Sequence, residues 1–153
     1  MKKIISITAF VSILLNLFLI YIFIFRGETV KTDDGRTEIR LSENNRDFAL
    51  DEMRGFLESV QQINEGILTE NKEIIIEAGN KSGGSVITHA PRGMMRALPS
   101  DFKALGFSTH GLFDEIANDA KENFDPVHTQ KQLNSLLNNC VACHQTFKIG
   151  LKE

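Results

Sequence analysis

The sequence predicts an all-α protein, an antiparallel four-helix bundle preceded by one N-terminal transmembrane helix. An almost unbroken apolar run covers residues 4–25. Four later segments place apolar residues at intervals of three and four, as amphipathic helices do, and the alternation typical of strands is almost absent. We expect an N-terminal membrane anchor in 1–26, a polar tether in 27–44 and one four-helix domain in 45–153.

The apolar run has 22 residues, from Ile4 to Phe25. At about 1.5 Å per residue, such a helix crosses a hydrocarbon layer of about 30 Å. A cleaved signal peptide is the alternative, but it needs a shorter apolar region and small residues at its cleavage site. Two lysines before the run favour a cytoplasmic N-terminus. We therefore expect a single-pass protein of the cytoplasmic (inner) membrane that contacts lipid through residues 4–25, with its C-terminal domain in the periplasm.

The charge of the remaining chain excludes one class of partner. Residues 27–153 contain all 20 acidic residues and 14 of the 17 basic residues, which gives a net charge of −6. Nucleic-acid-binding domains carry clustered positive charge instead. We expect no nucleic-acid partner.

The first helix of the predicted bundle begins after Ser42 and Asn45, which are possible N-caps. A second, shorter helix is expected from about Glu70 until the glycine-rich stretch 79–84. Three consecutive isoleucines in it also suit a strand, but the flanking Glu and Lys favour a helix. The apolar stripe of the first helix comprises Met53, Phe56, Leu57, Val60, Ile63 and Ile67.

The second half of the chain predicts an irregular stretch and two more helices. Prolines and a glycine interrupt residues 85–99, so a bent or broken helix is expected there. Ser100 can cap a third helix that ends near Glu122. The fourth helix has Asp125 as its predicted N-cap and Pro126 at its first position. Its apolar face comprises Leu133, Leu136, Leu137, Cys140, His144 and Phe147.

The fourth helix ends in a motif with a specific chemistry, Cys140-Val141-Ala142-Cys143-His144. C-x-x-C-H is the spacing of c-type haem attachment, in which two thiols add to the haem vinyl groups. On a helix the two cysteines lie at i and i+3, so their sulfurs emerge on one side, and the histidine at i+4 presents a nitrogen to the iron.

Three other readings of the two cysteines compete with haem attachment. A thioredoxin-like redox pair needs a βαβ context with its helix starting at the motif, and here only ten residues follow Cys143. A structural zinc site needs four ligands. The third alternative is a plain disulfide or a pair of core thiols.

The motif and its position resemble the class II c-type cytochromes, the cytochrome c-prime and cytochrome c-556 group, which are four-helix bundles with haem near the C-terminus. The match is specific over residues 140–148, where Phe147-Lys148 occupy the places of the family's aromatic and basic residues. The resemblance implies one covalent haem c, Lys148 near the proximal imidazole, and Arg54 of the first helix near a haem propionate. A solvated helix charge is an equal alternative for Arg54.

The resemblance extends over about residues 45–149, but residues 79–110 match no feature of the family. The membrane anchor also departs from its usual soluble, exported members.

The distal side of the iron is expected to face the start of the first helix, because that end lies beside the end of the fourth helix in an antiparallel bundle. Met53 can ligate the iron, as a methionine does in the c-556 type. Phe56 or Leu57 can instead cap an empty site, as apolar residues do in the c-prime type. His110 is the best other ligand, although a lone histidine is more often a core or rim residue.

The predicted function is electron transfer by a single-haem c-type cytochrome on the periplasmic face of the cytoplasmic membrane, with membrane or periplasmic redox proteins as partners and no enzymatic activity. One alternative is a five-coordinate haem protein that binds NO or CO, and a second is a structural haem subunit of a membrane complex. By the same resemblance a homodimer is possible.

Overall fold

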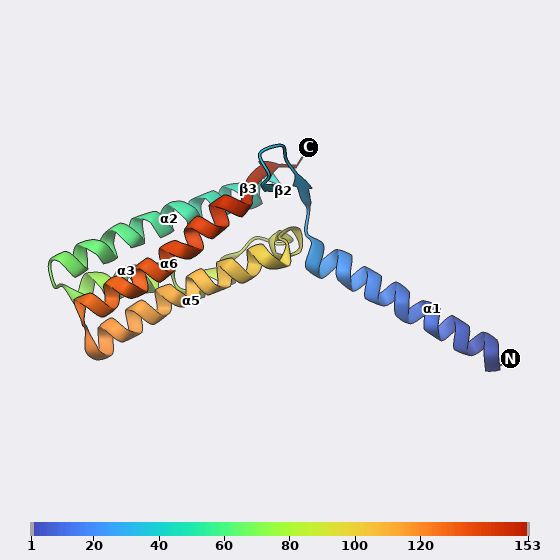
Figure 1. The fold of residues 1–153 in the computed structure, drawn as a ribbon, viewed down its shortest axis with the longest axis horizontal. Coiled ribbons are helices and arrows are strands. Elements are labelled where there is room, and N and C mark those ends of the chain that lie inside the picture. The colour runs from blue at the N-terminus through green and yellow to red at the C-terminus, as the bar shows by residue number, and fades with distance from the viewer. Residues whose placement is uncertain (1, 153) are drawn as a thin grey trace.

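The computed structural model describes residues 2–152, which form six α-helices and a three-stranded sheet (Figure 1). The helices are α1 (Lys2–Ile20), α2 (Glu43–Leu68), α3 (Lys72–Ser82), α4 (Met94–Ala97), α5 (Ser100–Asn123) and α6 (Pro126–Thr146), and the strands are β1 (Thr29–Lys31), β2 (Thr37–Leu41) and β3 (Phe147–Leu151).

Helices α2, α3, α5 and α6 pack against one another in a ring of neighbouring contacts. Each helix contributes its apolar stripe to one shared core, and burial of these stripes away from water favours the packing. The fully or almost fully buried members of this core are Ile63, Ile75, Ala78, Phe113, Ile116, Ala120, Leu133 and Leu136. Helix α3 has 11 residues whereas α2 has 26, α5 has 24 and α6 has 21, so it covers only part of their length.

Local signals account for several helix ends. The Asp125 carboxylate accepts hydrogen bonds from the backbone N–H groups of Val127 and His128, so the predicted cap of α6 is confirmed. The Asn71 side chain caps α3 in the same way, at the N–H groups of residues 73 and 74. Helix α5 starts at Ser100 itself, with Pro99 in the N-cap position.

A small sheet makes the expectation of an all-α fold wrong. Strands β1 and β2 form an antiparallel hairpin, and β3 pairs with β2 in parallel, from Thr37 opposite Phe147 to Leu41 opposite Leu151. Residues 27–44, expected to be a polar tether, therefore contain two strands. The physical reason is the alternation in β2, which turns Ile39 and Leu41 into the core with no exposed surface.

The expected transmembrane helix is also wrong. Within the part of the chain that the structure describes, none of the helices combines the length and the apolar character that a membrane crossing requires. The run counted over residues 4–25 is divided, because α1 ends at Ile20 and the next six residues form a π-helix. Two lysines and Ser6, Thr8, Ser12 and Asn16 further reduce the apolar length of α1. Single-pass anchoring in the cytoplasmic membrane, with a periplasmic C-terminal domain, is accordingly not supported.

Candidate functional site

A largely apolar cavity of about 350 Å³ lies among α2, α5, α6 and the segment 87–98. Its volume falls within the range of about 300–1,000 Å³ that is usual for small-molecule and cofactor sites. The predicted residues that line it are Met53, Phe56, Leu57, His110, Cys140, Cys143 and His144.

The cavity exists because α3 ends early. The helix stops at Ser82, and the next residues are Gly83 and Gly84, whose backbone passes against the Asp114 side chain of α5. The Gly84 N–H donates a hydrogen bond to Asp114 Oδ2 at 2.9 Å. A Cβ at Gly83 would lie too close to that carboxylate, so a larger residue at this turn would force the Asp114 side chain to move. Past this turn α3 no longer lies beside the three long helices of the bundle. Space therefore remains between α2, α5 and α6.

The irregular segment 84–98 closes one side of this space. It contains a short 3-10 helix and then α4, which agrees with the broken helix expected for residues 85–99. Met94 and Leu98 are buried in a second core with Ile39, Leu41 and Phe147, and they also line the cavity. Residues far apart in the sequence thus build one wall.

The motif residues lie at the C-terminal end of α6, and all three line the cavity. Cys140 and Cys143 are free, half-buried thiols, and His144 is exposed at the margin. Burial raises the pKa of the Cys140 thiol. Burial, with a smaller contribution from the charge of Cys140, raises the pKa of Cys143 to about 11. Both cysteines are therefore protonated thiols at neutral pH.

The sheet holds this end of α6 in place. Strand β3 begins at Phe147, directly after the last helical residue, so the motif is followed at once by five paired residues. Phe147 is buried, and its ring meets Phe102 of α5 edge to face, with 5.4 Å between centroids and an angle of 87°. His144 thus lies three residues before β3, and the buried Phe147 packs that strand against α5 of the bundle.

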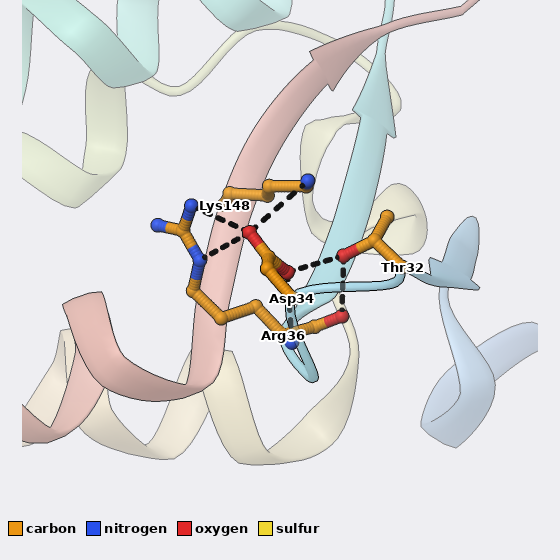
Figure 2. Close-up of polar contacts among 4 residues, drawn as sticks. All are labelled: Thr32, Asp34, Arg36 and Lys148. Carbon is orange, nitrogen blue, oxygen red and sulfur yellow. Dashed lines mark hydrogen bonds and ion pairs between the residues drawn. The ribbon is translucent and has the colours of Figure 1, made fainter.

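Two of the residues suggested by resemblance point elsewhere. Arg54 is exposed, and its guanidinium bonds to Asp51 Oδ1 at 3.0 Å on the same face of α2. Lys148 lies in β3, where its ammonium approaches Asp34 Oδ2 at 3.4 Å (Figure 2). Neither residue lines the cavity in the described structure.

Figure 2 shows the Asp34 carboxylate between Lys148, Arg36 and Thr32. The Thr32 hydroxyl donates to Asp34 Oδ1 at 2.7 Å, and the Arg36 guanidinium pairs with Oδ2 at 2.8 Å. These hydrogen bonds, the one from Thr32 first, hold the pKa of Asp34 well below its usual range. This cluster ties the β1–β2 turn to β3.

Further residues line the cavity besides those that the sequence analysis assigned to a site. From α2 come Phe48 and Glu52, and burial raises the pKa of the Glu52 carboxyl. From α5 come Phe102, Lys103 and Leu105. Phe48 lies on the same face of α2 as Glu52, four residues before it, and Phe102 lies on the same face of α5 as Leu105, three residues before it.

The residues present fit a covalently attached haem. Two unionised thiols at i and i+3 and an imidazole at i+4 share the margin of an apolar cavity of cofactor size. A redox-active thiol pair needs a lowered pKa and gains it at a helix N-terminus, whereas these thiols have raised pKa values and lie at a C-terminus. Among the residues that the structure describes, no cluster of three or more His, Cys, Asp and Glu side chains is arranged to hold a metal ion.

No protein-family model, curated protein or solved structure matches this chain.

Proposed function

We propose that this chain is a single-haem c-type cytochrome that transfers electrons. One observation carries the proposal: Cys140, Cys143 and His144, spaced as C-x-x-C-H, line the same apolar cavity. Neither the motif by itself nor the cavity by itself is sufficient support for a haem site. Their coincidence at one end of the bundle, where α3 leaves room, supports the assignment.

Each residue has a distinct task in this proposal. The Cys140 and Cys143 sulfurs form the two thioether links, and an imidazole nitrogen of His144 coordinates the iron. When bound, the haem supplies a reversible one-electron change at its iron. The apolar cavity walls keep water away and make the more highly charged oxidation state less favourable, which is one means by which a protein sets a haem potential.

The second candidate function is binding of a diatomic gas such as NO or CO. The apolar side chains of Phe56 and Leu57 of α2 line the cavity, although Leu57 is 71% exposed, and an apolar distal pocket favours small uncharged ligands. Gas binding requires an iron with an open coordination position. Electron transfer is favoured when two protein ligands hold the iron, because its coordination then changes little between oxidation states.

The deciding experiment is expression of the full chain with a c-type maturation system. We expect a red protein that keeps its haem after denaturation and acid–organic extraction, with a mass increase of one haem. Serine in place of both cysteines should abolish covalent retention. His144→Ala should keep the thioether links and change the iron spectrum, while His128→Ala, at a histidine paired with Asp119 away from the cavity, should leave both unchanged.

Absence of covalent haem in the unsubstituted chain, under conditions in which a control c-type cytochrome matures, would overturn the proposal. Given covalent haem, a reduced spectrum that is insensitive to carbon monoxide supports electron transfer, and one that shifts supports gas binding.

A further inference from the structure

The hydrogen bond of His110 defines the protonation of its imidazole. Nδ1 lies 2.8 Å from the carbonyl oxygen of Ser82. A carbonyl only accepts hydrogen bonds, so Nδ1 carries the proton and donates it. In the neutral ring Nε2 is then unprotonated and keeps its lone pair. The side chain lines the same cavity as Cys140, Cys143 and His144.

The hydrogen-bond acceptor is itself fixed by the early end of α3. Ser82 is the last residue of that helix and is buried, and its carbonyl is one of the last-turn acceptors that have no partner within the helix. Its hydroxyl bonds to the buried Ser59 hydroxyl of α2 at 2.8 Å. The feature that opens the cavity therefore also supplies the group that orients the histidine.

Two aromatic contacts restrict the ring further. Phe56 of α2 meets the His110 ring edge to face, with 5.0 Å between centroids and an angle of 70°. Phe56 is in turn stacked on the fully buried Phe113, with 5.3 Å between centroids. Helices α2, α3 and α5 together hold the imidazole, so little side-chain entropy remains to be lost when it binds a ligand.

Metal-binding histidines share this arrangement. Such residues almost always donate their second ring N–H to a carbonyl or carboxylate, which sets the tautomer and raises the basicity of the coordinating nitrogen. The sulfur candidates in the cavity are thioethers, which have no second group that could donate such an orienting hydrogen bond. Met94 is buried and packs in the second core with Leu98. Met53 has a flexible thioether side chain on α2, and Met95 is 37% exposed.

We propose that Nε2 of His110 is the sixth ligand of the haem iron, opposite His144, so that the chain holds a low-spin bis-histidine haem. The inference rests on the proposed function and makes it more specific, since two protein ligands leave no open position for a gas. Phe56 then orients the distal ligand instead of capping an empty site, and Met53 packs against the cofactor.

The test uses the full chain with covalently attached haem. Electron paramagnetic resonance and near-infrared magnetic circular dichroism of the oxidised protein distinguish imidazole–imidazole from imidazole–thioether ligation. We expect the bis-imidazole signature. His110→Asn keeps a side-chain N–H for the Ser82 carbonyl but removes the coordinating nitrogen, and we expect it to convert the protein to a high-spin form that binds carbon monoxide when reduced. Added imidazole should restore the low-spin spectrum.

Three further variants complete the design. His110→Met should remain six-coordinate and shift the reduction potential to a more positive value, because methionine ligation raises it. Met53→Leu tests the competing ligand, and the proposal requires its spectrum to stay low-spin and bis-imidazole. His128→Asn is the matched histidine control and should not change the spectrum.

The outcomes separate the two proposals. Lack of covalent haem in the unsubstituted chain contradicts the cytochrome assignment itself. Covalent haem with an imidazole–thioether spectrum that Met53→Leu abolishes overturns the role of His110 alone. A high-spin spectrum in the unsubstituted protein also overturns the role of His110. A low-spin spectrum that His110→Asn leaves unchanged overturns it as well.

Discussion

The two ends of the bundle have different constructions. At the closed end four helices meet, and each of five core side chains there is at most 2% exposed: Ile63, Ile75, Phe113, Leu133 and Leu136. At the cavity end, α3 is missing, and the sheet and segment 84–98 take its place around a void of about 350 Å³. One short helix therefore leaves a cavity at one end of the bundle while a close-packed core remains at the other.

Truncation of one phenylalanine at each end should give the largest contrast in stability. Phe113→Ala should lower the free energy of unfolding by about 3–5 kcal/mol, because the ring has no exposed surface and its loss leaves a cavity in a packed core. Phe102→Ala should cost only about 1–2 kcal/mol, since that ring is half-buried and already borders a void. Denaturant unfolding of the haem-free chain measures both, and equal losses would contradict the comparison.

Close helix packing at the closed end should be sensitive to one methyl group. In Gly79→Ala the new Cβ would lie 2.7 Å from the Phe113 carbonyl oxygen and 2.8 Å from Ala117 Cβ, so α3 and α5 must separate. We expect a loss of about 1–3 kcal/mol in unfolding free energy. Gly111→Ala, where a Cβ meets nothing within 4 Å, should instead stabilise helix α5 by about 0.5–1 kcal/mol. Thermal unfolding that shows the same sign for both would refute this view of the packing.

The junction between the two ends depends on the bond between the Ser59 and Ser82 hydroxyls. Ser59→Ala should cost about 1 kcal/mol, because it leaves Ser82 Oγ with only a 3.5 Å contact to the Gly55 carbonyl oxygen. The exposed control Ser135→Ala should stay within about 0.5 kcal/mol of the unsubstituted protein. Calorimetry of the two variants checks the difference, and a cost at Ser135 as large as that at Ser59 would count against it.

The smallest effect is expected at the Asp34 cluster of the cavity end. The pKa of this carboxyl is lowered in the folded state, so its ionised form stabilises the fold above the ordinary aspartate pKa of about 4. Below that pH the unfolded chain takes up the proton first and the contribution shrinks. Asp34→Asn should therefore be slightly less stable at neutral pH, and the difference should diminish in acid and in high salt. Unfolding at several pH values tests this, and a difference that grows in acid would be the contrary result.

Prediction from the sequence succeeded where the cause is local. The start of α6 follows from Asp125 and Pro126, whose cap and fixed φ act within one turn. The interrupted segment 84–98 follows from its prolines and glycines. The prediction missed β2 and β3, although both alternate, because each strand has only five residues and pairs with a partner about 110 positions away. The apolar run 4–25 misled for another reason, since hydropathy summed over a segment does not show where a helix changes its geometry.

The sequence by itself determined the C-x-x-C-H spacing, the amphipathic faces and the caps, because each depends on residues within one or two turns. Only the tertiary structure decided that β3 would hold the end of α6 and that Lys148 would pair with Asp34 away from the cavity. It also brought the Ser82 carbonyl to His110 Nδ1 across 28 positions. These contacts depend on which surfaces pack together. Packing brings together residues that are far apart in the sequence, so no local sequence pattern predicts the contacts.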